Sequence, residues 1–129
     1  MASTSLRRAL AVLAANEAAA KGSFLHALHE RDLFDTAAFR ALDAAMKVIA
    51  AVPPGARGRG TRQRAARVHR AILMHVIHHL NPHDGARIRR FPGRTLQALL
   101  DRLEWTFAPV IEGQHGYGSA DTRSGLRSE

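Results

Sequence analysis

The chain has 129 residues and no cysteine, 46% of its residues are hydrophobic and 5% are aromatic, and its formal net charge is +8. This length favours a single domain, and the lack of cysteine excludes disulfides, iron–sulfur clusters and thiolate zinc sites. No apolar run reaches the roughly 18 residues that a membrane helix needs. We therefore expect a cytoplasmic protein without membrane contacts, built from alanine- and leucine-rich helices.

Three helices are predicted before the middle of the chain. The first is capped by Thr4 or Ser5 and continues to about Ala20, where a Lys-Gly pair ends it. Ser23 caps a short second helix, and Asp35 opens a third one that a Val-Pro-Pro-Gly run ends. In each segment the apolar residues recur at the spacing of one helix face.

A basic linker is expected at residues 53–60, which read Pro-Pro-Gly-Ala-Arg-Gly-Arg-Gly. Glycine and proline at this density favour a flexible segment. The sequence predicts that this linker becomes ordered when it meets a polyanion.

The fourth predicted helix, roughly Thr61–Leu80, is amphipathic. At 100° per residue, one stripe faces the core and consists of Ala65, Val68, Ile72, Leu73, Val76 and Leu80. The opposite side consists of Gln63, Arg64, Arg67, Arg70, Met74 and His78. The arginines of this segment are therefore expected to form a ridge that faces solvent.

A second basic loop, 87–94, precedes the fifth helix, for which Thr95 is the expected cap. Pro109 is expected to kink or end this helix near Val110-Ile111. The remainder is rich in glycine, serine and charged residues, a composition typical of disorder. The sequence thus predicts an all-α bundle of four or five helices over residues 1–112 and a flexible tail over 113–129.

The positive charge is concentrated between residues 57 and 94, where ten arginines accompany a single acid, Asp84. The rest of the chain has nine basic and ten acidic residues. The ten arginines are called the arginine band: Arg57, Arg59, Arg62, Arg64, Arg67, Arg70, Arg87, Arg89, Arg90 and Arg94. We expect the helix ridge and the two basic loops to converge on one surface.

Guanidinium groups pair with phosphate through two parallel hydrogen bonds, so the arginine band predicts contact with an RNA or DNA backbone. Only Phe91 and Tyr117 accompany the basic residues, which argues against base readout by stacking. An acidic protein surface, as met by immunity or antitoxin-type modules, is the alternative partner. No catalytic residues and no cofactor are predicted on this interpretation.

Histidines gather near the end of the fourth helix, at positions 75, 78, 79 and 83. His75 and His79 have the spacing that lets two imidazoles share a metal ion from one helix face. No complete zinc motif accompanies them, and histidine is also favourable at a helix C-terminus. The sequence predicts no metal and leaves open whether this cluster binds one.

Arg70 and His75 fit the Arg-x4-His spacing of HEPN-type ribonucleases, which are also small and all-α. The resemblance implies that Arg70 and His75 are a catalytic pair for metal-independent RNA cleavage. On an ideal helix these side chains diverge by about 140°, and Ala71 stands where the family commonly carries a polar residue.

In architecture and charge, residues 1–112 resemble the small all-helical subunits of multisubunit CRISPR effector ribonucleoprotein complexes. These subunits hold guide RNA or target strand by the backbone. The resemblance implies a role in antiviral defence, with arginine contacts to phosphate on one face. The other face is then expected to bind further protein subunits, or copies of this chain.

Overall fold

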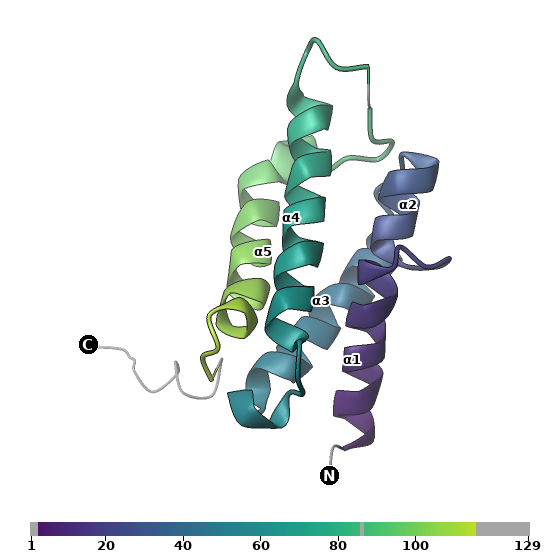
Figure 1. The fold of residues 1–129 in the computed structure, drawn as a ribbon. Helices are drawn as coiled ribbons and strands as arrows, with labels where there is room; N and C mark the ends of the chain where they lie inside the picture. Colours follow the sequence, from purple (N-terminus) through teal and green to yellow (C-terminus); the bar gives the residue numbers. More distant parts are fainter. Residues whose placement is uncertain (1–2, 86, 116–129) are drawn as a thin grey trace, which may run out of the picture.

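The computed structural model describes residues 3–85 and 87–115 and contains five α-helices within these ranges (Figure 1). The helices are α1 Thr4–Glu17, α2 Phe24–Arg31, α3 Thr36–Ala51, α4 Thr61–Leu80 and α5 Leu96–Ile111, with short 3-10 turns at Pro54–Ala56 (η1) and Gly93–Thr95 (η2). The predicted all-α bundle is confirmed. Among the described residues the only β contact is one isolated bridge between Leu33 and Arg89. No helix in this part of the chain has the length and apolar character to cross a membrane.

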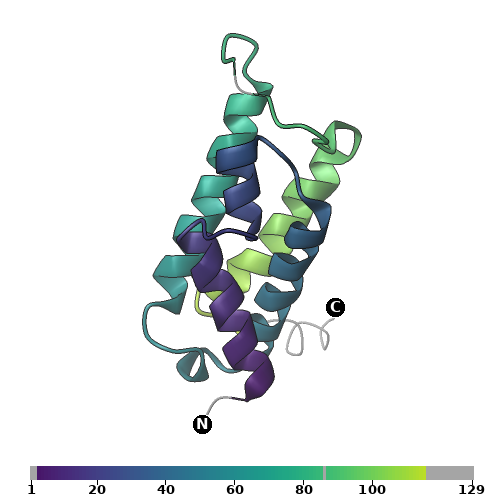
Figure 2. The same cartoon turned by 90° about the vertical axis from the view of Figure 1, so that its right-hand side faces the viewer.

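The four longer helices form a bundle in which α1 and α5 each pack against both α3 and α4. Figure 2 shows α1 (purple) between α4 (teal) and α3 (blue). As a result, α3 and α4 lie diagonally across the core. The short α2 covers one end, against α4, α1 and α3. The largest fully buried apolar side chains come from all five helices: Leu13, Phe24, Leu28, Leu42, Met46, Ile49, Ile72, Leu103 and Phe107.

Local capping explains most helix starts. The Ser23 hydroxyl and the Asp35 carboxylate accept the expected hydrogen bonds from the first turns of α2 and α3. The first helix is capped by Ser3, whose hydroxyl accepts from the Leu6 amide at 3.1 Å, so the predicted cap at Thr4 or Ser5 was wrong. This helix also ends earlier than predicted, because Ala19 adopts a left-handed conformation.

The start of α5 differs from the prediction, whereas its end at Ile111 agrees with the expected end near Val110-Ile111. The Thr95 hydroxyl donates to the Pro92 carbonyl and makes no capping bond to α5. Pro109 lies inside the helix, which continues to Ile111. Proline removes one amide donor, yet only two residues of the helix follow it, so little of the hydrogen-bond ladder is lost.

The segment 53–60, expected to be a flexible basic linker, contains one buried arginine: Arg57 lies inside the protein with 2% of its surface exposed. Its Nε and Nη2 atoms donate to the carbonyls of Ile49 at 3.0 Å and Ala50 at 3.0 Å, near the end of α3. Its Nη1 and Nη2 atoms also donate to the carbonyls of Pro109 and Gln114, at the end of α5. Arg57 therefore joins the C-terminal ends of two helices.

The predicted flexible tail also begins later than expected. Besides the contact between Arg57 and the Gln114 carbonyl, a ring nitrogen of His115 lies 2.9 Å from the Ala51 carbonyl. His115 thus contacts the end of α3, and the Gln114 carbonyl contacts Arg57. The rest of the predicted tail, 116–129, lies outside the described residues.

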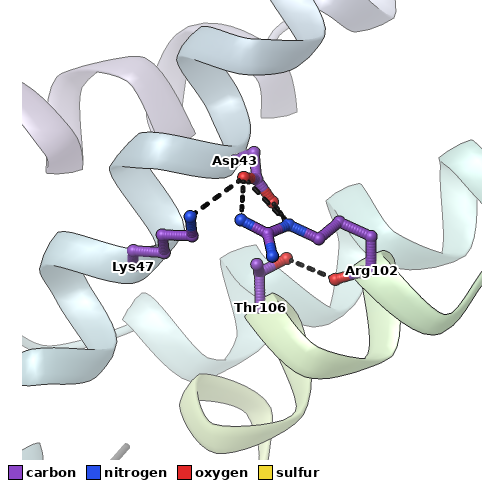
Figure 3. A network of polar contacts seen from close by, with 4 residues as sticks. All are labelled: Asp43, Lys47, Arg102 and Thr106. Atoms are coloured by element: carbon purple, nitrogen blue, oxygen red, sulfur yellow. Dashed lines mark hydrogen bonds and ion pairs between the residues drawn. The ribbon is translucent and has the colours of Figure 1, made fainter. Parts of the chain in front are cut away.

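A polar network joins α3 to α5 (Figure 3). Arg102 donates to both carboxylate oxygens of Asp43, at 2.9–3.1 Å, and Lys47 lies 3.7 Å from the same carboxylate. The Thr106 hydroxyl donates to the Arg102 carbonyl at 3.1 Å. Two-pronged geometry and the partial burial of Asp43 make this pair stronger than an exposed ion pair.

We expect Asp43→Ala to lower the free energy of unfolding by about 1–2 kcal/mol, because Arg102 then loses its acceptor in a partly buried position. The matched control is Asp101→Ala on α5, since the Asp101 carboxylate is exposed and accepts from Gln97. Its expected effect is below about 0.5 kcal/mol. Urea denaturation measures both, and equal losses would contradict the role given to Asp43.

Candidate nucleic-acid interface

The helix α4 has 20 residues, of which four are arginine, four are histidine and none is acidic. Ala65, Val68, Ile72 and Val76 are buried, as predicted, and Leu73 is partly buried. Leu80 is 51% exposed, so its predicted place in the core was wrong. Figure 1 shows the last turn of α4 reaching beyond the neighbouring ends of α5 and α2, where no helix is left to cover it.

Two arginines of the predicted ridge share one acidic partner, Glu17 at the end of α1. The Nε atom of Arg64 lies 2.7 Å from one carboxylate oxygen of Glu17, and the Nη1 atom of Arg67 lies 2.8 Å from the other. These hydrogen bonds, that of Arg67 first, lower the pKa of Glu17 below its ordinary value. A single negative charge thus neutralises half of this arginine pair, and the Arg67 side chain remains 70% exposed.

Three further arginines lie near the start of α4: Arg59 just before the helix, and Arg62 and Arg70 in its first half. Arg62 donates to the Ile111 carbonyl at 3.0 Å through Nε and is exposed. Arg70 and Arg59 are also exposed and have no carboxylate partner among the described residues. In the first half of α4, Arg62 thus contacts the end of α5, whereas Arg64 and Arg67 contact the end of α1.

The second basic loop, 87–94, is held away from the arginines in the first half of α4. Figure 2 shows this connection crossing one end of the bundle between α4 and α5. The Arg89 amide donates to the Asp32 carbonyl at 2.6 Å, and the Phe34 amide donates to the Arg89 carbonyl at 2.9 Å. The Arg87 side chain donates to the Asp84 carbonyl, and the Arg89 side chain donates to the Arg31 carbonyl. The loop is thus held against the connection between α2 and α3.

The arginine band consequently does not form the single surface that was expected. Arg57 is buried, and its guanidinium is occupied by backbone carbonyls. Arg90 borders a cavity between α3 and α5 that no residue of α4 lines, and Arg94 lies in η2 beside the start of α5. What remains together is the group on α4: Arg62, Arg64, Arg67 and Arg70. We call this group the α4 arginines.

The clustered histidines point to different partners. A ring nitrogen of His78 lies 2.7 Å from an Asp84 carboxylate oxygen, and His79 accepts a hydrogen bond of 2.8 Å from the Ile88 amide. The His75 ring packs against His29. Across residues 3–85 and 87–115, no group of three metal-ligating side chains is present.

Burial opposes the protonation of three histidines on α4. It lowers the pKa of His69, which stacks on Phe107, and of His75 and His79. For His75, the neighbouring His29 and His78 lower the pKa further, and Asp32 opposes them. The neutral imidazole is therefore the form that the fold accommodates.

We expect the folded protein to lose stability as the pH falls below about 6.5, the ordinary histidine pKa. Because the folded pKa values are lower, unfolding takes up protons between the two values, and the full stability is present above this window. His75→Gln should weaken the dependence of stability on pH. His83→Gln, at an exposed position, should leave this dependence unchanged. Urea midpoints at about pH 5.5 and about pH 7.5 measure this. An equal change in urea midpoint between the two pH values for wild type and His75→Gln would contradict this expectation.

The HEPN-type pair is not assembled within the described chain. Arg70 faces solvent, whereas His75 is partly buried and its ring contacts His29 of α2. The helix is continuous between them, so the two side chains diverge by about 140°.

Comparisons with protein-family models, with curated proteins and with solved structures found no match to this chain. Helical periodicity placed Arg64, Arg67 and Arg70 on the outer face of α4, whereas Arg62 was predicted only as part of the arginine band. Their partner Glu17 was missed, because it lies 47 and 50 positions away from the two arginines and no local pattern marks it.

Proposed function

We propose that this chain is a non-catalytic cytoplasmic subunit that binds the phosphate backbone of RNA or DNA through the α4 arginines. The observation that carries the proposal is an amphipathic helix of 20 residues that has four arginines, three of them exposed, and no acidic residue. Glu17 is the one carboxylate that pairs with them among the described residues.

The spacing of these arginines suits a phosphate chain. Arg62 and Arg70 are separated by eight positions, or about 12 Å along the helix axis. One strand of B-form DNA carries a charge per about 3.4 Å of axis, so this length spans three or four phosphates. The positive end of the α4 macrodipole lies beside the same arginines and adds to the attraction. Long side chains that already lie at the surface reach phosphates with little rearrangement.

In line with the resemblance in architecture and charge, we place this subunit within a larger ribonucleoprotein complex of the CRISPR effector kind. In such an assembly the arginines hold guide or target strand by its backbone. The apolar residues at the other end of α4, Met74, Ile77 and Leu80, are at least 39% exposed and are suited to contacts with neighbouring subunits. A nuclease role is not favoured, since Arg70 and His75 do not face one site.

Fluorescence anisotropy with a labelled RNA strand, DNA strand and DNA duplex of about 20 nucleotides tests the proposal. With three or four phosphate contacts, log K should fall against log salt with a slope of about −3 on duplex DNA and about −2.5 on single strands. Affinity that does not change with salt would rule the proposal out. Equal displacement by poly-glutamate would favour an acidic protein partner, and cleavage of the RNA in EDTA would favour the nuclease.

Glu17→Gln should tighten nucleic-acid binding about threefold or more, because it removes the carboxylate that Arg64 and Arg67 share. The control is Asp101→Asn, which makes the same charge change on α5 away from these arginines. Anisotropy titrations at one fixed salt concentration compare the two variants. If both tighten binding equally, net charge rather than this site determines the affinity.

A further inference from the structure

A cavity of about 390 Å³ lies between α3 and α5, and no residue of α4 lines it. Its walls are mainly apolar and include Phe34, Phe39, Pro92 and Leu99. Two arginines, Arg90 and Arg102, also line it, and no acidic residue does. The volume lies within the range of about 300–1,000 Å³ that small-molecule sites occupy.

The walls are held by an aromatic cluster. The Phe34 ring packs against Phe24 at 5.0 Å, Phe39 at 5.4 Å and Phe91 at 6.5 Å between ring centroids. Phe34 and Leu99 are each 7% exposed. Because several elements fix these side chains, the cavity does not require rearrangement before a ligand enters.

The two arginines differ in how their charge is matched. Arg102 is bound by both oxygens of Asp43, so its charge is balanced within the protein (Figure 3). Arg90 is exposed and has no carboxylate partner among the described residues. Its φ angle of 60° is in the left-handed region, which is uncommon for a residue with a side chain. The bonds between Phe34 and the Arg89 carbonyl fix the chain immediately before this turn.

We propose that this cavity binds a small carboxylic acid with an aromatic body, whose carboxylate pairs with Arg90. An arginine without a carboxylate partner among mainly apolar lining residues suits a ligand with a single negative charge, and the guanidinium fork matches a carboxylate. The aromatic body of the ligand packs against Phe34, Phe39 and Leu99. This site is separate from the α4 arginines, so either proposal can fail without the other.

The test is a titration of the full chain with 4-phenylbutyrate, followed by amide chemical shifts. We expect saturable shifts at Phe34, Phe39 and Leu99 with a Kd in the low-millimolar range, about what a ligand of this size reaches. Shifts that saturate elsewhere, or no shifts at about 10 mM, would overturn the proposal.

Two comparisons test whether the positive charge of Arg90 selects the ligand. Arg90→Gln should weaken 4-phenylbutyrate binding about tenfold, whereas Arg94→Gln, an exposed arginine in η2 that does not line the cavity, should leave the Kd unchanged. The neutral amide 4-phenylbutyramide should also bind about tenfold more weakly than the acid. Equal binding of acid and amide, or equal binding by wild type and Arg90→Gln, would show that the guanidinium does not select the ligand.

Discussion

Arg57→Met is expected to lower the free energy of unfolding by about 3–5 kcal/mol. The methionine keeps most of the apolar stem but leaves the carbonyls of Ile49, Ala50, Val52, Pro109 and Gln114 without their donor. These carbonyls lie at the C-terminal ends of α3 and α5, where the helix macrodipoles favour a positive charge. Burial lowers the pKa of Arg57, yet the ordinary value is so high that the group stays charged.

The matched control is Arg59→Met, two positions along the same segment, because Arg59 is exposed where Arg57 is buried. Its expected effect is below about 0.5 kcal/mol. The loss of unfolding free energy for Arg57→Lys should lie between these two values. A lysine ammonium group keeps the positive charge, but it lacks the forked guanidinium that donates to both helix ends. Urea denaturation followed by circular dichroism gives all three values. An Arg57→Met variant as stable as wild type would show that this guanidinium does not join the two helices.

Arg67→Glu combined with Arg70→Glu is expected to weaken nucleic-acid binding on the order of 100-fold. Under the proposed function, the double variant removes two phosphate contacts, and it replaces two positive charges on α4 with negative ones, one of them beside Glu17. The matched control is Arg90→Glu combined with Arg94→Glu, which makes the same change in net charge beside α3 and α5. We expect that pair to weaken binding about fivefold or less, through the long-range field alone.

Anisotropy titrations of the two double variants at the same salt concentration provide the comparison, and thermal melts check that both remain folded. Equal losses would contradict the proposed site, because they would mean that only the total charge of the protein matters.

Much of the helical architecture could be predicted from sequence, since helices arise from local patterns. The stripe Ala65, Val68, Ile72 and Val76 repeats at helical spacing and is buried as expected. Ser23 and Asp35 cap their helices because a side chain next to a free amide needs no distant partner. Periodicity therefore identified both the core face and the arginine face of α4.

Features that depend on distant contacts could not be predicted. In the segment 53–60 the local composition favours flexibility, and only the ends of α3 and α5 explain why Arg57 is buried. In the same way, the loop arginines follow α4 in the sequence but are drawn toward α2 and α3 by backbone bonds to Asp32 and Phe34. Closeness along the chain did not ensure a common surface.

Amide chemical-shift mapping with an RNA strand of about 12 nucleotides tests the central claim most directly. We expect the largest shifts on residues 61–70 of α4 and on Glu17, and we expect them to fade as the salt concentration rises. Shifts concentrated on the 87–95 loop and the cavity between α3 and α5, or unchanged spectra at low salt, would contradict it.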